Sequence, residues 1–472
     1  MRLKLSSSRL GSIAFVAAAS ALIGSQMVHP SKRVIEALVG LLFVYLFANF
    51  SNINALWFLL IIYPFPFGIS VGNSTFIFII VMFIIYLLRV SAHRSIFRGD
   101  RQFNLPIVLL VMSCIISFYN QDTSGNLMRF ALIYTINFLA AVLFFYMIIN
   151  FVDDEAKLKK TIAVSIFTCG LVITFTILEL LFPGRELIPN WLYTEHKIAL
   201  IMKGQRMGGP FHDFELNAEF FAMNVPIILL MIVRSRRLLT RSIYTILLVT
   251  NLFMLFATMT RGAFISLVIG MIYMAYACRK DLNFVRFASL IIIAVVLVFA
   301  LDMIVAQHTI SGSLLTRLVQ ENKYVHGIPY NRYWAWVGAV NRAREHLIIG
   351  HGPGWDFSRG LKLEFWPHNA YLFYLDIGGL FGLFGFVFLL VRLVKASFVS
   401  WKSSLARSPL PEAFMKVLNV SLVIFIIDQM KIDYLRNTIY LYFVWFFFGL
   451  IAATRNIILE KERTRLASSP SR

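Results

Sequence analysis

Residues 130–151 read FALIYTINFLAAVLFFYMIINF, a stretch of 22 residues without a charged side chain. An α-helix needs about 20 mainly apolar residues to cross the hydrocarbon core of a bilayer. We therefore predict a membrane-spanning helix here, and similar apolar runs recur along most of the chain.

The composition of the whole chain is that of a protein dissolved in lipid. Of its 472 residues 59% are hydrophobic and 14% are charged, and the mean hydropathy is +0.74, which leaves too little polar surface for a soluble domain. We predict an all-α, polytopic integral membrane protein with about fourteen transmembrane helices (about 12–14) and a large extracytoplasmic loop late in the chain. The predicted spans are 12–28, 34–50, 54–70, 75–90, 104–118, 130–151, 160–182, 214–233, 243–258, 262–278, 285–305, 369–394, 414–430 and 438–454.

The short connecting segments indicate the side of the membrane on which each loop lies, because Lys and Arg are enriched in cytoplasmic loops. With the N-terminus in the cytoplasm, the basic segments alternate as this rule requires, with Lys32 and Arg33 as the main exception. This parity places both termini inside and the two sizeable loops, 183–213 and 306–368, outside. The segments assigned to the inner side are 2–9, 89–101, 157–160, 234–241, 279–286, 392–416 and 455–472.

The N-terminal run is basic and then apolar, as in a cleaved signal peptide. No clear A-x-A site precedes a polar mature start, so we expect the first span to be retained. We expect the basic, Ser-rich C-terminal tail to be disordered. The resulting parts are N-terminal transmembrane helices (1–182), a first periplasmic loop (183–213), transmembrane helices (214–305), a large periplasmic loop (306–368), C-terminal transmembrane helices (369–454) and a cytoplasmic basic tail (455–472).

Several kinds of site are not expected. The formal charge of +20 could suggest nucleic acid, but no basic run is interleaved with a soluble fold. The cysteines Cys114, Cys169 and Cys278 fall inside apolar runs and are expected to be small core residues. His346 and His351 lie five residues apart without an H-E-x-x-H pattern, so neither a metal nor a cofactor is expected.

Three arginines on the predicted outer side are candidates for binding an anion, because Arg stays ionised and its planar fork can grip phosphate. Arg206 ends the first outer loop, and Arg332 lies in the aromatic segment 330–336. Arg261 lies in the tight outer turn 258–262, where a charge at membrane depth is costly without a partner. The alternative for Arg261 is an arginine that extends its head group to the interface.

The chain re-enters the membrane at Trp366-Pro367-His368-Asn369. Pro367 is suited to the first turn of a helix, so His368 is expected to be fixed at a helix start at the interface, where it can act as a general base. The turn-rich segment 350–355, GHGPGW, has no Lys-Ser/Thr pair after it and is expected to shape the loop rather than bind phosphate as a P-loop does.

Together these motifs resemble the O-antigen ligase and polymerase superfamily, bacterial membrane glycosyltransferases that act on lipid-linked sugars at the outer face of the inner membrane. The resemblance covers about 200–390, and its specificity comes from the order of the stretches. One departure is 212–216, HDFEL, which is more acidic than the usual approach to Asn217. The matching stretches are 206–211 leading to Asn217, the turn 258–262, Arg332 with Trp336 and then 350–354, and His368-Asn369 with Leu372, Gly379 and Gly382.

The resemblance implies a metal-independent glycosyltransferase in the bacterial inner membrane whose donor glycan is carried on polyprenyl diphosphate and whose acceptor is a glycan or a lipid-linked sugar. Arg206, Arg261 and Arg332 would hold the diphosphate, and His368 would be the catalytic base. Membrane lipid would be a further partner, and a polymerase could also have a chain-length regulator as a partner. The residues expected to shape the site or contact sugar are Asn217, Trp336, Gly352, Gly354 and Asn369.

Three functions stay open at this point. We favour a polymerase that joins oligosaccharide repeats into O-antigen or exopolysaccharide, and the alternative within the superfamily is a ligase that moves finished glycan to lipid A core or another acceptor. A lipid-linked sugar flippase is the alternative of another class. It is disfavoured because no internal repeat is found and few charges fall inside the spans, namely Glu179, Asp376 and Asp428.

Overall fold

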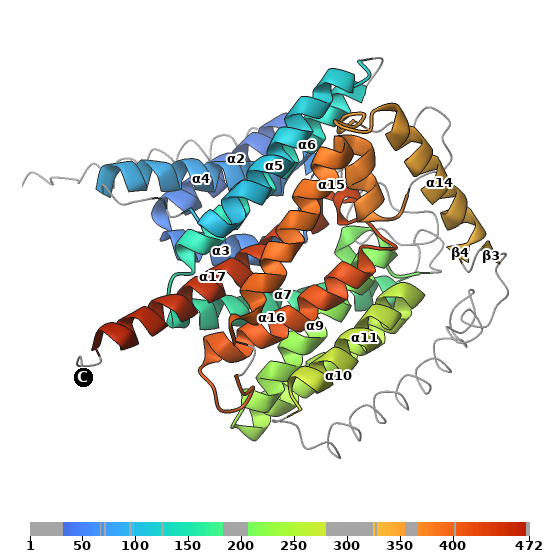
Figure 1. Cartoon of the computed structure of the whole chain (residues 1–472). Coiled ribbons are helices and arrows are strands. Elements are labelled where there is room, and N and C mark those ends of the chain that lie inside the picture. Colours follow the sequence, from blue (N-terminus) through green and yellow to red (C-terminus); the bar gives the residue numbers. More distant parts are fainter. Residues whose placement is uncertain are drawn as a thin grey trace, which may run out of the picture.

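The computed structural model describes residues 32–66, 68–69, 72–93, 97, 99–123, 127–182, 206–279, 324–325, 328–354, 367–400 and 403–468 (Figure 1). These parts form a bundle of α-helices with two very short β-hairpins, so the predicted all-α class is confirmed. Nine helices of the described parts are long and apolar enough to cross a membrane, as a polytopic membrane protein requires. The total of fourteen stays a prediction, because 12–28 and 285–305 lie outside the described residues.

The long helices lie largely alongside one another, and α14 caps one end of them (Figure 1). The long apolar helices are α4 Ser74–His93, α5 Arg101–Ser117, α6 Leu127–Phe151, α7 Glu155–Leu181, α9 Phe214–Arg234, α10 Leu238–Ala257, α15 Ala370–Ser397, α16 Leu410–Asp428 and α17 Thr438–Ser468. The other helices are α2 Lys32–Asn49, α3 Asn52–Ile62, α11 Arg261–Ala277, α14 Tyr330–Glu345 and the short η1 Phe118–Asn120, η3 Gly209–Phe211, η5 Phe398–Ser400 and η6 Tyr434–Arg436. The antiparallel strand pairs are β1 Gly68–Ile69 with β2 Gly72–Asn73 and β3 Tyr324–Val325 with β4 Ile328–Pro329.

The predicted span 54–70 is wrong in its extent. Helix α3 begins after the N-cap Ser51 and ends at Ile62, so it has 11 residues and a length of only about 17 Å. Pro64 and Pro66 follow, and proline supplies no N–H and disfavours helical geometry in the residue before it. The chain therefore leaves the helix before it can cross about 30 Å of hydrocarbon, and it turns into the β1–β2 hairpin.

The expectation that the tail 455–472 is disordered is also wrong for most of its length, because α17 continues without a break to Ser468. Its extension is bound to the rest of the bundle. Arg455 lies 3.6 Å from Asp100, Lys461 pairs with Glu155, and Ile457 is buried. A basic composition therefore does not leave this segment without partners.

The membrane half of α17 lies at the centre of the core. Trp445 is fully buried, and its ring meets the edges of Phe138 and Phe145 from α6, with ring centroids 5.6 and 6.0 Å away. The hydroxyl of Tyr442 on α17 donates to the side-chain oxygen of Asn137 on α6 (2.7 Å). As predicted, all three cysteines are buried in the core.

Helix α15 packs closely on α5 because glycines line its contact face. A Cβ atom on Gly385 would meet Leu110 at 3.2 Å, and one on Gly382 would meet the Ser113 hydroxyl at 3.3 Å. Gly379 has a different role, since its backbone is non-helical (φ 63°, ψ −161°) and α15 bends there. The small glycine residues thus allow the close contact between α15 and α5, and the bend is a separate feature of α15.

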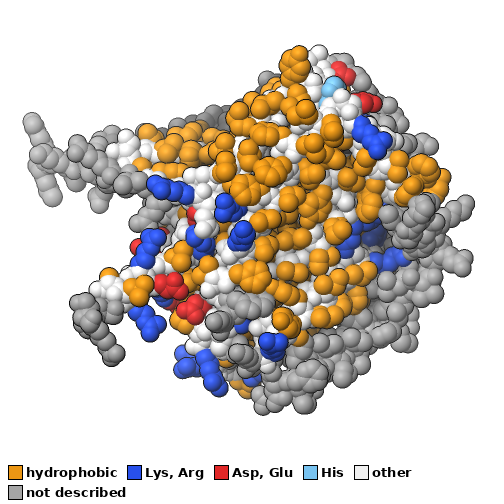
Figure 2. All heavy atoms as spheres, viewed as in Figure 1, with side chains coloured by type: hydrophobic (Ala, Val, Ile, Leu, Met, Phe, Trp, Pro, Cys, Tyr) orange, Lys and Arg blue, Asp and Glu red, His pale blue; other side chains and the backbone are white. Residues whose placement is uncertain are grey.

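The connections between helices fall into two groups at opposite ends of the bundle. One end carries the C-terminus of α17 (Figure 1). At this end Arg234, the last residue of α9, donates to the carbonyls of Leu405 and Ser408 in the connection that precedes α16. Figure 2 shows hydrophobic side chains over the middle of the bundle and many Lys and Arg side chains toward the side where α17 ends. The opposite end carries α14 and the segments described next.

Candidate active site

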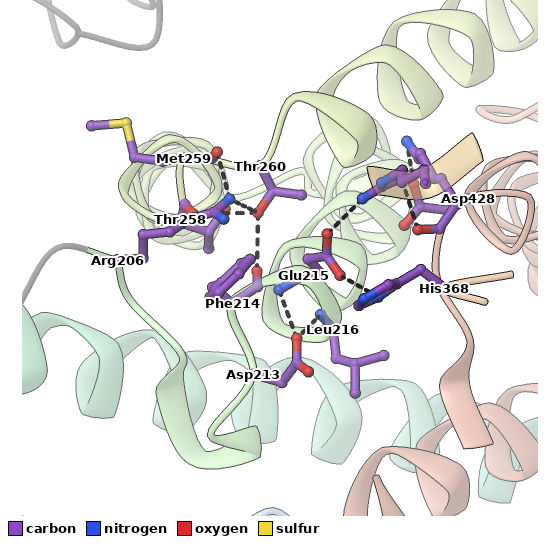
Figure 3. A network of polar contacts seen from close by, with 12 residues as sticks. Arg206, Asp213, Phe214, Glu215, Leu216, Thr258, Met259, Thr260, His368 and Asp428 are labelled. Atoms are coloured by element: carbon purple, nitrogen blue, oxygen red, sulfur yellow. Dashed lines mark hydrogen bonds and ion pairs between the residues drawn. The ribbon is translucent and has the colours of Figure 1, made fainter. Parts of the chain in front are cut away.

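At the end of the bundle away from the C-terminus of α17, polar side chains converge from segments far apart in the sequence (Figure 3). The first is the start of α9, where Asp213 is the N-cap and its carboxylate accepts the N–H groups of Glu215 and Leu216 (2.8 and 3.1 Å). An acidic side chain is favourable at this position because it meets the positive end of the helix dipole. The cap fixes the first turn of α9 and with it the position of Glu215.

Arg206 joins this helix start to the turn before α11. Its guanidinium donates to the carbonyl oxygens of Thr258 (3.0 Å) and Met259 (2.6 Å) and to the Thr260 hydroxyl (3.1 Å). Its Cζ lies 3.4 Å from the ring centroid of Phe214. Met259 has a left-handed backbone (φ 54°), and these bonds hold that turn in place (Figure 3).

Glu215 lies at the centre of the site and connects two residues from distant segments (Figure 3). Arg332 of α14 donates to its Oε1 at 2.8 Å, and His368 Nδ1 lies 3.7 Å from its Oε2. The three side chains are largely buried, with exposed fractions of 13% for Glu215, 29% for Arg332 and 25% for His368. Arg332 also donates to the carbonyl of Lys431 (3.0 Å).

His368 is held in a left-handed backbone conformation (φ 44°) by bonds on both sides of it. The Trp336 indole N–H donates to the carbonyl of Pro367 (2.8 Å), and the Asn369 side chain donates to the carbonyl of Met430 (2.9 Å). Asn369 is the N-cap of α15, which begins at Ala370. The expectation that Pro367 lies in the first helical turn is therefore wrong, and His368 precedes the cap.

Such a conformation is uncommon for a residue other than glycine and is found most often where the surrounding structure imposes it. In the described residues the other two non-glycine residues with positive φ, His212 and Met259, lie at this same end of the bundle. The strain therefore concentrates around the candidate site.

Arg261 and Lys431 add two further cations. Arg261 is the first residue of α11 and is half-buried, and within the described parts of the chain its guanidinium has no hydrogen-bond or ion-pair partner. The Lys431 side chain packs against Gly262, so it lies beside the start of the same helix. Its Nζ is 2.6 Å from the buried carboxylate of Asp428 and donates to Ser266 (2.9 Å).

Gly352 and Gly354 lie elsewhere. The segment after α14 pairs its backbone with the bend of α15, where His351 N donates to the carbonyl of Asp376 (2.9 Å) and Gly352 N to that of Ile377 (3.0 Å). Gly354 N donates to the Gln121 side chain (2.7 Å). The backbone of this segment is thus bound to α15 and to Gln121, and the structure does not bring these glycines to His368.

Arg342 holds this second region together by donating to both carboxylate oxygens of Asp376 (3.3 and 3.2 Å). Burial lowers the pKa of Arg342, and the Asp376 carboxylate opposes that change. Arg342 lies ten residues beyond Arg332 on α14, which is about 15 Å along a helix axis. The region around Arg332 and the region around Arg342 therefore lie at opposite ends of α14.

Asn217 is fully buried one turn into α9, and its amide N–H donates to Thr176 Oγ1 of α7 (3.4 Å). Of the residues predicted from the sequence, the structure thus brings together Arg206, Arg332, Trp336, His368 and Asn369 through direct bonds to a shared set of segments, with Arg261 beside them. The roles proposed for these residues stay predictions.

Sequence reasoning missed Glu215 and Lys431. Glu215 is part of the acidic stretch 212–216 that departs from the family pattern, and that departure was the available signal. Lys431 follows the buried Asp428 by three residues, in the turn after α16 ends, and this short spacing between opposite charges was the available signal. Among the described residues no group of three His, Cys, Asp or Glu side chains could hold a metal ion.

Comparison of the chain with protein-family models and with curated proteins finds no match. The family resemblance therefore rests on the motif residues alone. What the fold and the site define directly is a class, namely a polytopic helical membrane protein with a cluster of acidic, basic and imidazole side chains at one end of its bundle.

Proposed function

We propose that this protein is a metal-independent glycosyltransferase of the O-antigen ligase and polymerase type, and that it polymerises polyprenyl-diphosphate-linked oligosaccharide repeats into O-antigen or exopolysaccharide. The observation that supports this most is the convergence of His368, Glu215 and Arg332, which come from three separate segments. Arg261 begins α11 at the same end of the bundle, and its guanidinium has no ion-pair partner among the residues that the structure describes. A base next to an anion site is what transfer of sugar from a diphosphate requires.

The reaction follows from these groups. The oxygen of the acceptor hydroxyl forms a bond to the anomeric carbon of the donor sugar as the bond from that carbon to the diphosphate oxygen breaks. The hydroxyl proton passes to the neutral imidazole of His368, and the electron pair leaves with the diphosphate. Arg261 stabilises the charge that develops on the leaving group, because it lies half-buried where water screens charges less.

The other two arginines have different parts in this proposal. Arg332 is paired with Glu215, so it holds that carboxylate and lies close enough to contribute to the anion site. Arg206 donates hydrogen bonds to the turn 258–260 and thereby positions the start of α11, where Arg261 lies. Trp336 anchors Pro367 and so positions His368.

The proposed location is the bacterial inner membrane, with both termini in the cytoplasm and the site at the periplasmic face. The end of the bundle that carries the end of α17 also carries Arg234 and Arg455, as the positive-inside rule predicts for a cytoplasmic face. The site lies at the other end, where polyprenyl diphosphate of the outer leaflet and its periplasmic glycan would both reach it.

The proposal is tested in cells that lack the gene, complemented with the wild type or with His368→Ala. Loss of a polymerase leaves single repeats, whereas loss of a ligase leaves long chains on the carrier lipid. We expect single repeats in the deletion strain and with His368→Ala, provided that immunoblots show equal protein in the membrane. Long chains on the carrier lipid would show that the protein is a ligase and not a polymerase. Unaltered glycan would contradict both assignments.

A further inference from the structure

We propose that Glu215 is a positioning residue for His368: its carboxylate fixes the proton of the imidazole on Nδ1, so that Nε2 receives the proton of the acceptor hydroxyl, and Arg332 holds the carboxylate in place. This inference rests on the proposed function for the identity of that hydroxyl. The coupling between the two side chains can be measured without any glycan.

The first support is the geometry of the carboxylate. Oε1 of Glu215 accepts from Arg332 at 2.8 Å, and this bond orients the carboxyl group so that the other oxygen, Oε2, faces His368 Nδ1 at 3.7 Å. That separation is within ion-pair range and slightly longer than a hydrogen bond. Bonds of catalytic histidines are often long without substrate and shorten when it binds.

The second support is that hydrogen bonds from neighbouring residues fix the backbone at both Glu215 and His368. Glu215 lies in the first turn of α9, which the Asp213 cap fixes through two backbone bonds. His368 is fixed by Trp336 on one side and by Asn369 on the other. Because neither backbone is free to move away, the distance between the two side chains is set by the fold, as an orienting carboxylate requires.

The third support concerns the choice of nitrogen. A neutral imidazole has one protonated nitrogen, and a carboxylate beside Nδ1 favours the proton there. The lone pair then lies on Nε2, the nitrogen farther from the backbone. An imidazole that has accepted a second proton is stabilised by the same carboxylate, which makes His368 a stronger base.

Other charged side chains near Glu215 and His368 also affect the protonation of His368, and they come from the segments that form the site. Arg332 opposes protonation of His368, and the Asp428–Lys431 pair is close to neutral as a unit. We therefore expect the net effect of Glu215 to be smaller than that of an isolated carboxylate. The charged groups on the segments that meet here are Arg332 from α14, Asp428 from the end of α16, Lys431 from the turn after it, Asp213 at the cap of α9 and Arg206 from the segment before it.

The test measures how fast diethyl pyrocarbonate modifies His368 as a function of pH in the full-length protein, with peptide mass spectrometry as the readout. The reagent attacks the neutral imidazole, so the midpoint of the rate profile reports the titration of His368. We expect Glu215→Gln to move this midpoint down by about one pH unit, because an opposite charge at this distance favours the charged imidazole. The exposed His346 in the same samples is the internal control and should not move.

Arg332→Gln provides the opposite sign and keeps the inference testable if Glu215→Gln folds poorly. Removing the guanidinium leaves the carboxylate to His368 alone, so the midpoint should rise relative to wild type. Glu219→Gln is the matched carboxylate control, since Glu219 lies one turn deeper on α9 and accepts from Gln429 (2.7 Å), and it should leave the midpoint of His368 in place.

Transfer activity adds a readout that a merely structural role would not change. For Glu215→Gln we expect the acidic limb of the pH–rate profile to move to lower pH while the plateau falls at least about tenfold, because a weaker and less well oriented base removes part of its catalytic contribution. Glu215→Asp should restore the wild-type midpoint in part.

An unchanged His368 midpoint in both Glu215→Gln and Arg332→Gln would overturn the inference, whatever the activity. Shifted midpoints in a protein that transfers no glycan would uphold the Glu215–His368 coupling and overturn the proposed function instead. The two failures are therefore distinguishable.

Discussion

Replacement of Gly379 by alanine should open the contact between the bend of α15 and the segment that follows α14. The Gly379 backbone (φ 63°, ψ −161°) lies in a region that residues with a Cβ atom essentially do not occupy. A Cβ atom there would also lie far inside van der Waals distance of the carbonyl group of Ile348. Since that group is backbone and not a flexible side chain, the segment must move.

The size of the effect follows from these contacts. The backbone strain amounts to about 1–3 kcal/mol and the overlap to about 1–3 kcal/mol more. The flanking bonds, Leu380 N to the Leu347 carbonyl (2.8 Å) and Gly352 N to the Ile377 carbonyl (3.0 Å), would lengthen as the segment moves away. We expect Gly379→Ala to destabilise the protein by about 3 kcal/mol or more.

The assay is thermal unfolding in detergent, followed with a thiol-reactive fluorophore. It suits this protein because all three cysteines are buried, and Cys114 lies on α5, against which α15 packs. Gly170→Ala is the control: a Cβ atom there would meet only Leu247, at an ordinary 3.8 Å, and alanine favours the helix by about 0.5–1 kcal/mol. If Gly379→Ala melted at the temperature of the wild type, the described bend would be wrong.

Three further outcomes are expected. Arg206→Lys should lower the melting temperature, because lysine cannot replace the bonds to the turn before α11, and melting as in wild type would contradict this role. Arg261→Lys should leave the melting temperature unchanged and raise the KM for the lipid-linked donor at least about tenfold, and an unchanged KM would favour an arginine that merely reaches the interface. Lys431→Met should destabilise the protein by about 3 kcal/mol because it leaves the Asp428 carboxylate buried without its cation, and Lys431→Met combined with Asp428→Asn should recover part of that loss, as denaturation curves would show.

Much of the fold follows from composition and length alone. Apolar runs predict the long helices because lipid leaves the backbone no partner outside the helix. The end of α3 could have been predicted too, since Pro64 and Pro66 stand within the expected span. The helical tail could not, because its stability depends on pairs such as Lys461 with Glu155, which only the folded bundle brings together.

For the site, the sequence indicates which residues can do chemistry but not which of them meet. His368, Arg332 and Arg261 stand out as residue types at predicted interfaces. Glu215 looks like any acid in a first helical turn, and its meeting with Arg332, 117 residues away, is a tertiary contact. Gly352 illustrates the converse, because it is near His368 in sequence and lies at the far end of α14 in space.

The most direct measurement of the proposed function uses purified protein in liposomes with a polyprenyl-diphosphate-linked oligosaccharide as the only substrate and no added metal. We expect the wild type to produce a ladder of carrier-linked glycans that differ by one repeat, and His368→Ala to leave the single repeat unchanged while it inserts and melts like the wild type. A ladder of equal length with His368→Ala would contradict the assignment of the base. Passage of the lipid-linked sugar across the bilayer without a ladder would show a flippase in place of a glycosyltransferase.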